Sequence, residues 1–235
     1  MSAGRAVLVL AFSSLVVARV LAADLDGAAP GAGLVPPGLA VRPELRLVWF
    51  DPADVGDGAG PGARDEAKKL LSAMGLDVRW RPGRSDEVAQ EDEIRVILLD
   101  RAAVNAQGAP VLGSTPRKPG ELPYLWVHVP SVRASLGATE HDGSLSEFAG
   151  RRRVATAIGR VIAHEVVHVL APAIPHGRGL MASRLTSRDL TSGATPVDPE
   201  VALAVRTALT GGPVPPPADA DGLVAVEHAG KEVRR

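Results

Sequence analysis

Short apolar runs separated by polar turns dominate the first half of the chain. Residues 44–51 (ELRLVWFD) and 93–100 (EIRVILLD) are compact apolar runs, which are typical of buried strands. Residues 77–82 (DVRWRP) alternate apolar with charged side chains, and this pattern predicts a half-exposed strand. Residues 124–129 (YLWVHV) form a further apolar run. The pattern therefore predicts about four strands.

Two further segments have the spacing of amphipathic helices. Apolar residues recur at helical intervals in residues 63–75, and Gly75 is well placed to end that helix. Residues 198–212 predict a last helix, in which Asp198 is the N-cap and Gly211 follows the end.

A long helix is expected between these two. Ser144 and Glu147 fit an S-x-x-E capping box, and from there a helix can run to about Leu170, where Pro172 stops it. Residues 101–123 are rich in Gly, Pro and charge and are expected to form a loop. The order of elements predicts one α+β (α/β-like) domain, with a mixed twisted sheet, a backing helix, the long helix and a C-terminal helix.

The two ends of the chain differ in composition from the middle. Residues 1–23 resemble a signal peptide, since Arg5 precedes a short apolar run and small residues that suit cleavage. The run is too short for a comfortable membrane span, so we expect no stable span after processing and a secreted or periplasmic protein. Residues 24–42 predict a flexible lead-in, residues 43–211 the folded domain, and residues 212–235 a disordered tail.

Composition narrows the chemistry that the domain can perform. Apolar residues make up 46% of the chain and aromatic residues only 3%, so aliphatic side chains must build the core. The formal net charge of −1 gives no indication of a nucleic-acid partner. The chain has no cysteine, which excludes disulfides and thiol nucleophiles. Any metal site must therefore use His, Asp or Glu.

One stretch, residues 164–181 (HEVVHVLAPAIPHGRGLM), contains three of the six histidines. His164 and His168 are four residues apart, so on a helix both imidazoles face the same way, separated by about 40° and one turn. That spacing lets both rings reach one Zn²⁺ ion. Glu165 can then reach the open metal position and accept a proton from water there.

Two histidines hold zinc weakly, so a third protein ligand is expected. His176 is the first candidate, because Pro172 and Pro175 force the chain out of the helix and the turn can bring this residue back to the metal. Asp189 is an alternative metal ligand, and Glu200 is a weaker one.

The histidines could instead be solvated residues of an ordinary helix in a metal-free structural domain. The segments around them (VIA, VV and VL) are strongly apolar, however, so the helix is expected to be largely buried. Burying two His and a Glu is costly unless a partner satisfies them. A metal ion is such a partner.

The stretch resembles the zincin metallopeptidases and, more narrowly, metzincins of matrixin-like type, whose pattern is H-E-x-x-H-x-x-G-x-x-H followed by a Met-turn. The third His lies twelve positions after the first instead of ten, and Ala171 replaces the family's glycine. Met181 lies where a Met-turn could form. A site with Asp189 as third ligand would instead resemble aspzincins.

The resemblance implies an exported zinc-dependent metalloendopeptidase with one Zn²⁺, in which Glu165 is the general base and the substrate is a peptide or protein. The alternative is a non-catalytic zinc-binding module of the envelope or secretome, since the longer spacer could misplace the third ligand. In zincins an edge strand pairs with the substrate backbone. Tyr124, Trp126 and His128 lie on the strand that could do so here, and the alternative is that this strand is an ordinary member of the sheet.

Overall fold

Five strands form the main sheet of the domain, in the order β2-β1-β3-β7-β6. The computed structural model describes residues 42–211 except 85–86, 88–89, 91, 117–121, 138–146 and 194. The strands are β1 (Glu44–Phe50), β2 (Asp77–Pro82), β3 (Glu93–Leu99), β6 (Gly113–Ser114) and β7 (Tyr124–His128). The first four in this order run parallel, and β6 pairs antiparallel with β7 at the edge.

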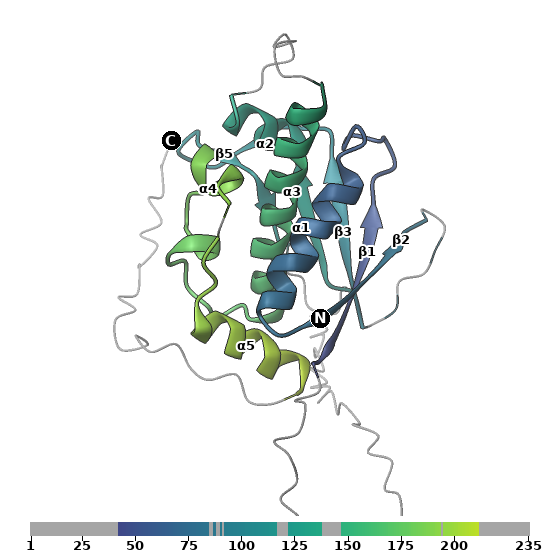
Figure 1. Ribbon diagram of the computed structural model, residues 1–235, viewed down its shortest axis with the longest axis vertical. Coiled ribbons are helices and arrows are strands. Elements are labelled where there is room, and N and C mark those ends of the chain that lie inside the picture. The colour runs from purple at the N-terminus through teal and green to yellow at the C-terminus, as the bar shows by residue number, and fades with distance from the viewer. Residues whose placement is uncertain are drawn as a thin grey trace, which may run out of the picture. The chain divides into compact units, whose positions relative to one another are not determined.

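A small hairpin and five α-helices complete the described part of the chain (Figure 1). The hairpin joins β4 (Ala103–Val104) to β5 (Pro110–Val111) in a separate two-stranded sheet. The helices are α1 (Gly60–Ala73), α2 (Val129–Ser135), α3 (Glu147–Leu170), α4 (Ser187–Thr191) and α5 (Pro199–Leu209), and a short 3-10 helix, η1, spans Gly179–Met181.

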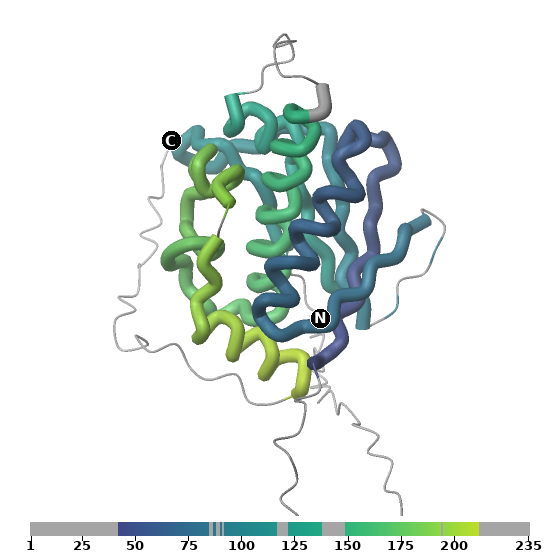
Figure 2. Tube along the Cα trace, viewed as in Figure 1, coloured from purple at the N-terminus to yellow at the C-terminus, as the bar shows by residue number. Residues whose placement is uncertain are grey.

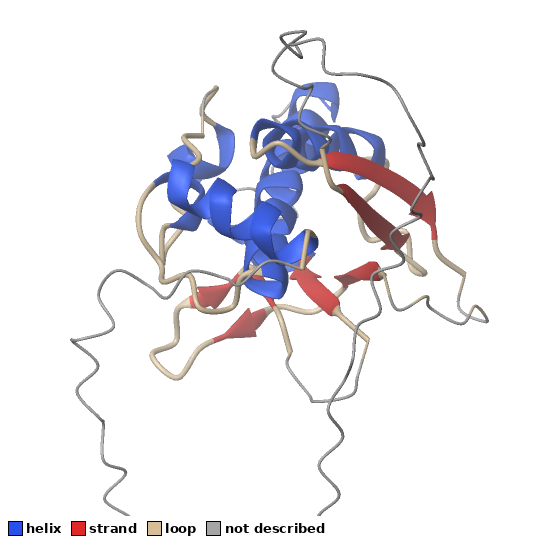
Figure 3. Cartoon of the chain, turned by 90° about the horizontal axis from the view of Figure 1, so that it is seen from below, coloured by secondary structure: helices blue, strands red, loops and turns tan. Residues whose placement is uncertain are grey.

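Helices α1 and α3 pack side by side against the main sheet (Figure 1), and the view from below shows helices gathered on one side of the strands (Figure 3). Small residues allow this close contact. A Cβ atom on Gly159 of α3 would lie only 2.6 Å from the carbonyl oxygen of Ala63 in α1. A side chain at Gly159 would therefore push the two helices apart.

The core between the sheet and the helices is aliphatic. Leu47, Val96 and Val127 from the strands and Leu71 and Ile162 from the helices are fully buried. The prediction that aliphatic side chains build the core is confirmed in the part of the chain that the structure describes.

The chain reverses direction after α3. Figure 2 traces the green segment that leaves the end of α3, turns back alongside it through η1 and reaches α4 before it continues into α5. Both η1 and α4 contact α3. This return places α4 against the middle of α3, where Arg160 bonds to the carbonyl of Asp189, and η1 beside His164.

The mixed α/β class and the four long strands are confirmed, and α3 ends at Leu170 as predicted. The predicted helix ends are also confirmed: Gly75 and Gly211 follow helices with φ of 91° and 71°, and the Asp198 side chain accepts a hydrogen bond from the amide of Glu200. Within the described residues the sheet has five strands rather than four, and most are parallel.

The prediction of a loop over residues 101–123 is wrong, since β4, β5 and β6 lie there. Strands of two residues are too short to show an alternating pattern. Ser144 lies outside the described residues, as do the predicted signal peptide, nearly all of the lead-in and the predicted tail. Within the described ranges, no helix is long and apolar enough to cross a membrane.

Candidate metal centre

Two of the three histidines lie on the last two turns of α3. His164 is buried with 7% of its surface exposed, and His168 is half-buried. Their Nε2 atoms are 3.1 Å apart, because four residues of helix place the two rings on one face. The prediction that the helix brings His164 and His168 together is confirmed.

The third histidine comes from the turn that follows α3. Ala171 extends the helical hydrogen bonding by one step, from its amide to the carbonyl of Val167 (2.7 Å). The amide of Ile174 then bonds back to the carbonyl of Ala171, which closes a turn around Pro172. The chain returns so that Nε2 of His176 lies 3.2 Å from Nε2 of His168.

The donor atoms of His164, His168 and His176 all lie within 4.8 Å of one another, so the three residues can hold a metal ion. The spacer that is two residues longer than in the metzincin pattern therefore does not keep His176 away. Two prolines and a closed turn absorb the extra length.

A backbone carbonyl fixes the orientation of the first ring. Nδ1 of His164 lies 2.7 Å from the carbonyl oxygen of Leu180, which can only accept a hydrogen bond. Nδ1 therefore carries the proton, and Nε2 keeps its lone pair for a metal. Burial lowers the pKa of His164 and that of His176, which favours the neutral rings that metals bind.

Glu165 is held next to this cluster. Its side chain is 7% exposed, and the hydroxyl of Thr115 donates a 2.7 Å hydrogen bond to its Oε2 atom. Burial raises the pKa of Glu165 to about 7, while the Thr115 hydrogen bond and the nearby His176 act in the opposite direction. The carboxyl group is thus poised to exchange a proton near neutral pH.

The edge strand β6 passes directly over this carboxylate. A Cβ atom on Gly113 would lie 2.7 Å from Cγ of Glu165 and 2.7 Å from Cγ1 of Val161. Only glycine fits at this point, because any larger residue would displace either the strand or the Glu165 side chain. Gly113 therefore sets the distance between the sheet edge and α3.

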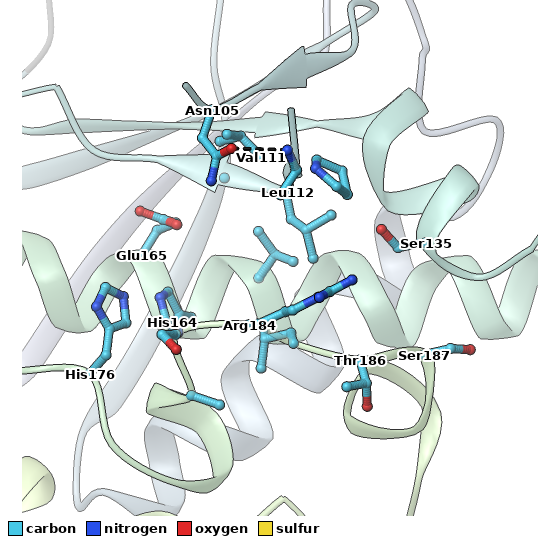
Figure 4. Close-up of a pocket in the computed structure, with 17 residues that line it drawn as sticks. Asn105, Val111, Leu112, Ser135, His164, Glu165, His176, Arg184, Thr186 and Ser187 are labelled. Atoms are coloured by element: carbon cyan, nitrogen blue, oxygen red, sulfur yellow. Dashed lines mark hydrogen bonds between the residues drawn. The ribbon is translucent and has the colours of Figure 1, made fainter. Parts of the chain in front are cut away.

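A cavity of about 640 Å³ opens onto the site. His164, Glu165 and His176 line one end, and Figure 4 shows the Glu165 carboxylate and the two imidazoles together there. The rest of the wall comes from the β4–β5 hairpin, β6, the end of α2 and the segment between η1 and α4. Cavities of this size are typical of sites for small molecules and peptide side chains.

Met181 lies in the turn that follows the third histidine. It is 3% exposed and ends η1, and its carbonyl accepts a 2.7 Å hydrogen bond from the amide of Gly177. The bond closes a tight loop next to His176. That this loop acts as a Met-turn stays a prediction.

Asp189, the alternative candidate for the third metal ligand, caps a helix instead. Its carboxylate accepts hydrogen bonds from the amide and the hydroxyl of Thr186, in a capping box at the start of α4. Among the described residues, the group able to hold a metal contains neither Asp189 nor Glu200. Glu200 lies in the first turn of α5.

The proposed substrate-pairing strand is not the sheet edge. β7, with Tyr124, Trp126 and His128, is paired with β3 on one side, and Trp126 faces Ser114 of β6 on the other. The edge prediction is therefore wrong, and β6 takes that position. His128 is buried, and its Nδ1 atom contacts the carbonyl oxygen of Arg101, as an ordinary strand residue would.

Sequence reasoning missed the parts of the site that lie outside the histidine motif. Thr115 and Gly113 belong to the segment expected to be a loop, and Arg184 follows the motif without any periodic pattern. The apolar residues just before Gly113 were the only signal in the sequence that a strand could lie there.

Comparison with protein-family models gave no match, and comparisons with curated proteins and with solved structures gave none either. Any functional assignment therefore depends on the geometry of the site itself.

Proposed function

We propose that this protein is an exported zinc-dependent metalloendopeptidase. His164, His168 and His176 hold one zinc ion, Glu165 is the general base, and water is the nucleophile. The observation that carries the proposal is the convergence of three imidazoles beside a buried carboxylate at the end of an open cavity. Three protein ligands plus a free position are typical of catalytic rather than structural zinc sites.

The spacing of the ring nitrogens supports zinc as the metal. At Zn–N distances of about 2.0–2.1 Å and tetrahedral angles, two ligand nitrogens lie about 3.3–3.4 Å apart. Nε2 of His168 lies 3.1 Å from Nε2 of His164 and 3.2 Å from Nε2 of His176, and all three donor atoms lie within 4.8 Å of one another. Neutral imidazole nitrogens are ligands that zinc readily accepts, and the chain has no thiolate to compete with them.

The proposed chemistry assigns each residue a task. When bound, zinc supplies Lewis acidity, which lowers the pKa of a coordinated water and polarises a peptide carbonyl. Glu165 accepts the proton that the attacking water loses, and it then donates that proton to the leaving amine. Thr115 holds the carboxylate in place for both transfers.

The resemblance to zincins fits the arrangement of the fold. A mostly parallel sheet with one antiparallel edge strand lies against a long helix that carries the H-E-x-x-H residues. Export is proposed on the signal-peptide pattern of residues 1–23.

A single substitution tests the proposal. The Glu165→Ala variant of the mature protein should keep one zinc, measured by elemental analysis, and lose cleavage of a mixed peptide library. Glu200→Ala, which alters an exposed carboxylate of α5, is the control and should cleave as the wild type does. Wild-type protein that holds zinc but cleaves nothing would favour the non-catalytic zinc-binding module instead.

A further inference from the structure

A cationic side chain lines the part of the cavity that lies away from the histidines. Arg184 is exposed and belongs to the segment between η1 and α4. Figure 4 shows its guanidinium pointing away from Glu165 and His176, toward the end of the cavity lined by Ser135 and Ser187. The cavity thus has a proposed catalytic end and a separate cationic end.

No described residue forms a hydrogen bond or an ion pair with Arg184. Some other arginines of the fold are engaged by carboxylates. Arg81 pairs with Glu93 at 2.6 Å, and the buried Arg160 pairs with Glu66 at 3.1 Å. The charge of Arg184 is therefore available to a ligand inside the cavity, where a guanidinium favours a planar anion that can accept two hydrogen bonds.

The remaining lining complements an anion as well. Among the described residues that line the cavity, Glu165 is the only carboxylate, and Thr115 already binds it at the opposite end. Ser135, Ser183 and Ser187 add hydroxyl-bearing residues to the lining, and apolar residues line the cavity as well. A group with an apolar stem and a carboxylate tip matches this distribution.

We propose that Arg184 selects peptide substrates that place a carboxylate in this cavity, next to the bond to be cleaved. The inference rests on the proposed peptidase function and adds its substrate class. The carboxylate could belong to an Asp or Glu side chain or to the free C-terminus of the peptide. Both present the same planar anion to the guanidinium, and about 640 Å³ accommodates either.

Binding can be measured without cleavage in full-length protein that carries Glu165→Gln and zinc. Peptides that differ only by Glu or Gln at one position, each with a free acid or an amidated C-terminus, are titrated by calorimetry. We expect the preferred carboxylate peptide to bind about twofold to fivefold tighter than its neutral partner. The pair that shows the preference identifies the source of the carboxylate.

Two arginine variants in the same background make the test specific. Arg184→Ala should abolish the preference, and Arg184→Glu should reverse it in favour of peptides with Lys at that position. Arg188→Ala removes an exposed cation of α4 that does not line the cavity, and it should leave the preference unchanged. Equal binding of acidic and neutral peptides, or equal effects of the Arg184 and Arg188 variants, would overturn the inference.

Cleavage profiles separate this inference from the proposed function. Wild-type protein that cleaves peptides with no preference for a carboxylate would refute the role of Arg184 and leave the peptidase function intact. A binding preference that depends on Arg184, in a protein that cleaves no peptide, would support the carboxylate site and refute the peptidase chemistry.

Discussion

The hydroxyl of Thr115 donates a 2.7 Å hydrogen bond to Oε2 of Glu165, across 50 residues of sequence. The bond links the end of the edge strand to the helix that carries two histidines of the metal centre. It fixes the carboxylate of a buried acid beside the three imidazoles, and it opposes the rise in pKa that burial causes. Both effects bear on how Glu165 would move a proton.

Removing that hydroxyl should therefore slow catalysis more than it weakens substrate binding. We expect Thr115→Val to lower kcat about tenfold with little change in KM, because the carboxylate loses its orientation. Thr115→Ser keeps the hydroxyl and should restore the rate. Thr156→Val, at a half-buried site of α3 where the hydroxyl bonds to the carbonyl of Arg152, is the matched control. A rate loss as large in Thr115→Ser as in Thr115→Val would contradict this role.

The close approach of β6 to Glu165 gives a second prediction. Gly113→Ala would place a methyl group 2.7 Å from Cγ of Glu165 and from Cγ1 of Val161. We expect a loss of about 1–3 kcal/mol in the free energy of unfolding. We also expect a loss of activity that is larger than this loss of stability can account for. Gly193→Ala, where a Cβ would meet nothing within 4 Å, should be neutral in urea unfolding. A fully active Gly113→Ala protein would show that the edge strand moves freely.

The sequence predicted the elements that leave a local pattern in the chain. Three of the four long strands were found as continuous apolar runs and the fourth by its alternation, while the helix of the H-E-x-x-H motif was found from a capping box and the proline that stops it. The position of His176 followed from two prolines, which end a helix for a local steric reason. In each case the structural cause acts within a few residues along the chain.

The rest of the site depends on contacts between distant segments. Thr115 meets Glu165 only because β6 pairs with β7, and a two-residue strand leaves no periodic trace. β7 was predicted to be the sheet edge because the short strand β6, which lies outside it, was not recognised in the sequence. Asp189 was a candidate metal ligand because of its residue type. Its carboxylate instead accepts hydrogen bonds from Thr186, three residues earlier, in a capping box.

The capping role of Asp189 predicts separate effects on stability and metal binding. Asp189→Ala should lower the free energy of unfolding by about 1 kcal/mol at neutral pH, because a hydrogen-bond acceptor at the start of α4 is lost. The Thr186 hydrogen bonds lower the pKa of Asp189 below 3.8, so this contribution is present above that pH and is lost as the pH falls through the lowered pKa. Zinc content should be unchanged. Zinc loss in this variant would instead favour Asp189 as a ligand.

Metal binding should resist mild acid. The pKa values of His164 and His176 are lowered from 6.5 by burial, and only neutral rings bind zinc. Burial therefore weakens the competition of protons with the metal at these two rings. Zinc affinity, measured by competition with a chelating dye, should begin to fall at a lower pH than it would for unperturbed imidazoles. A fall that begins at the same pH as for unperturbed imidazoles would contradict the lowered pKa values.

Anomalous scattering at the zinc edge, from crystals of protein purified without added metal, tests the central claim most directly. The account predicts one zinc about 2.0–2.1 Å from Nε2 of His164, His168 and His176, with water in the fourth position facing Glu165. A fourth protein side chain in that position would close the site to substrate and contradict the proposed peptidase. The absence of zinc at the three histidines would contradict the metal centre itself.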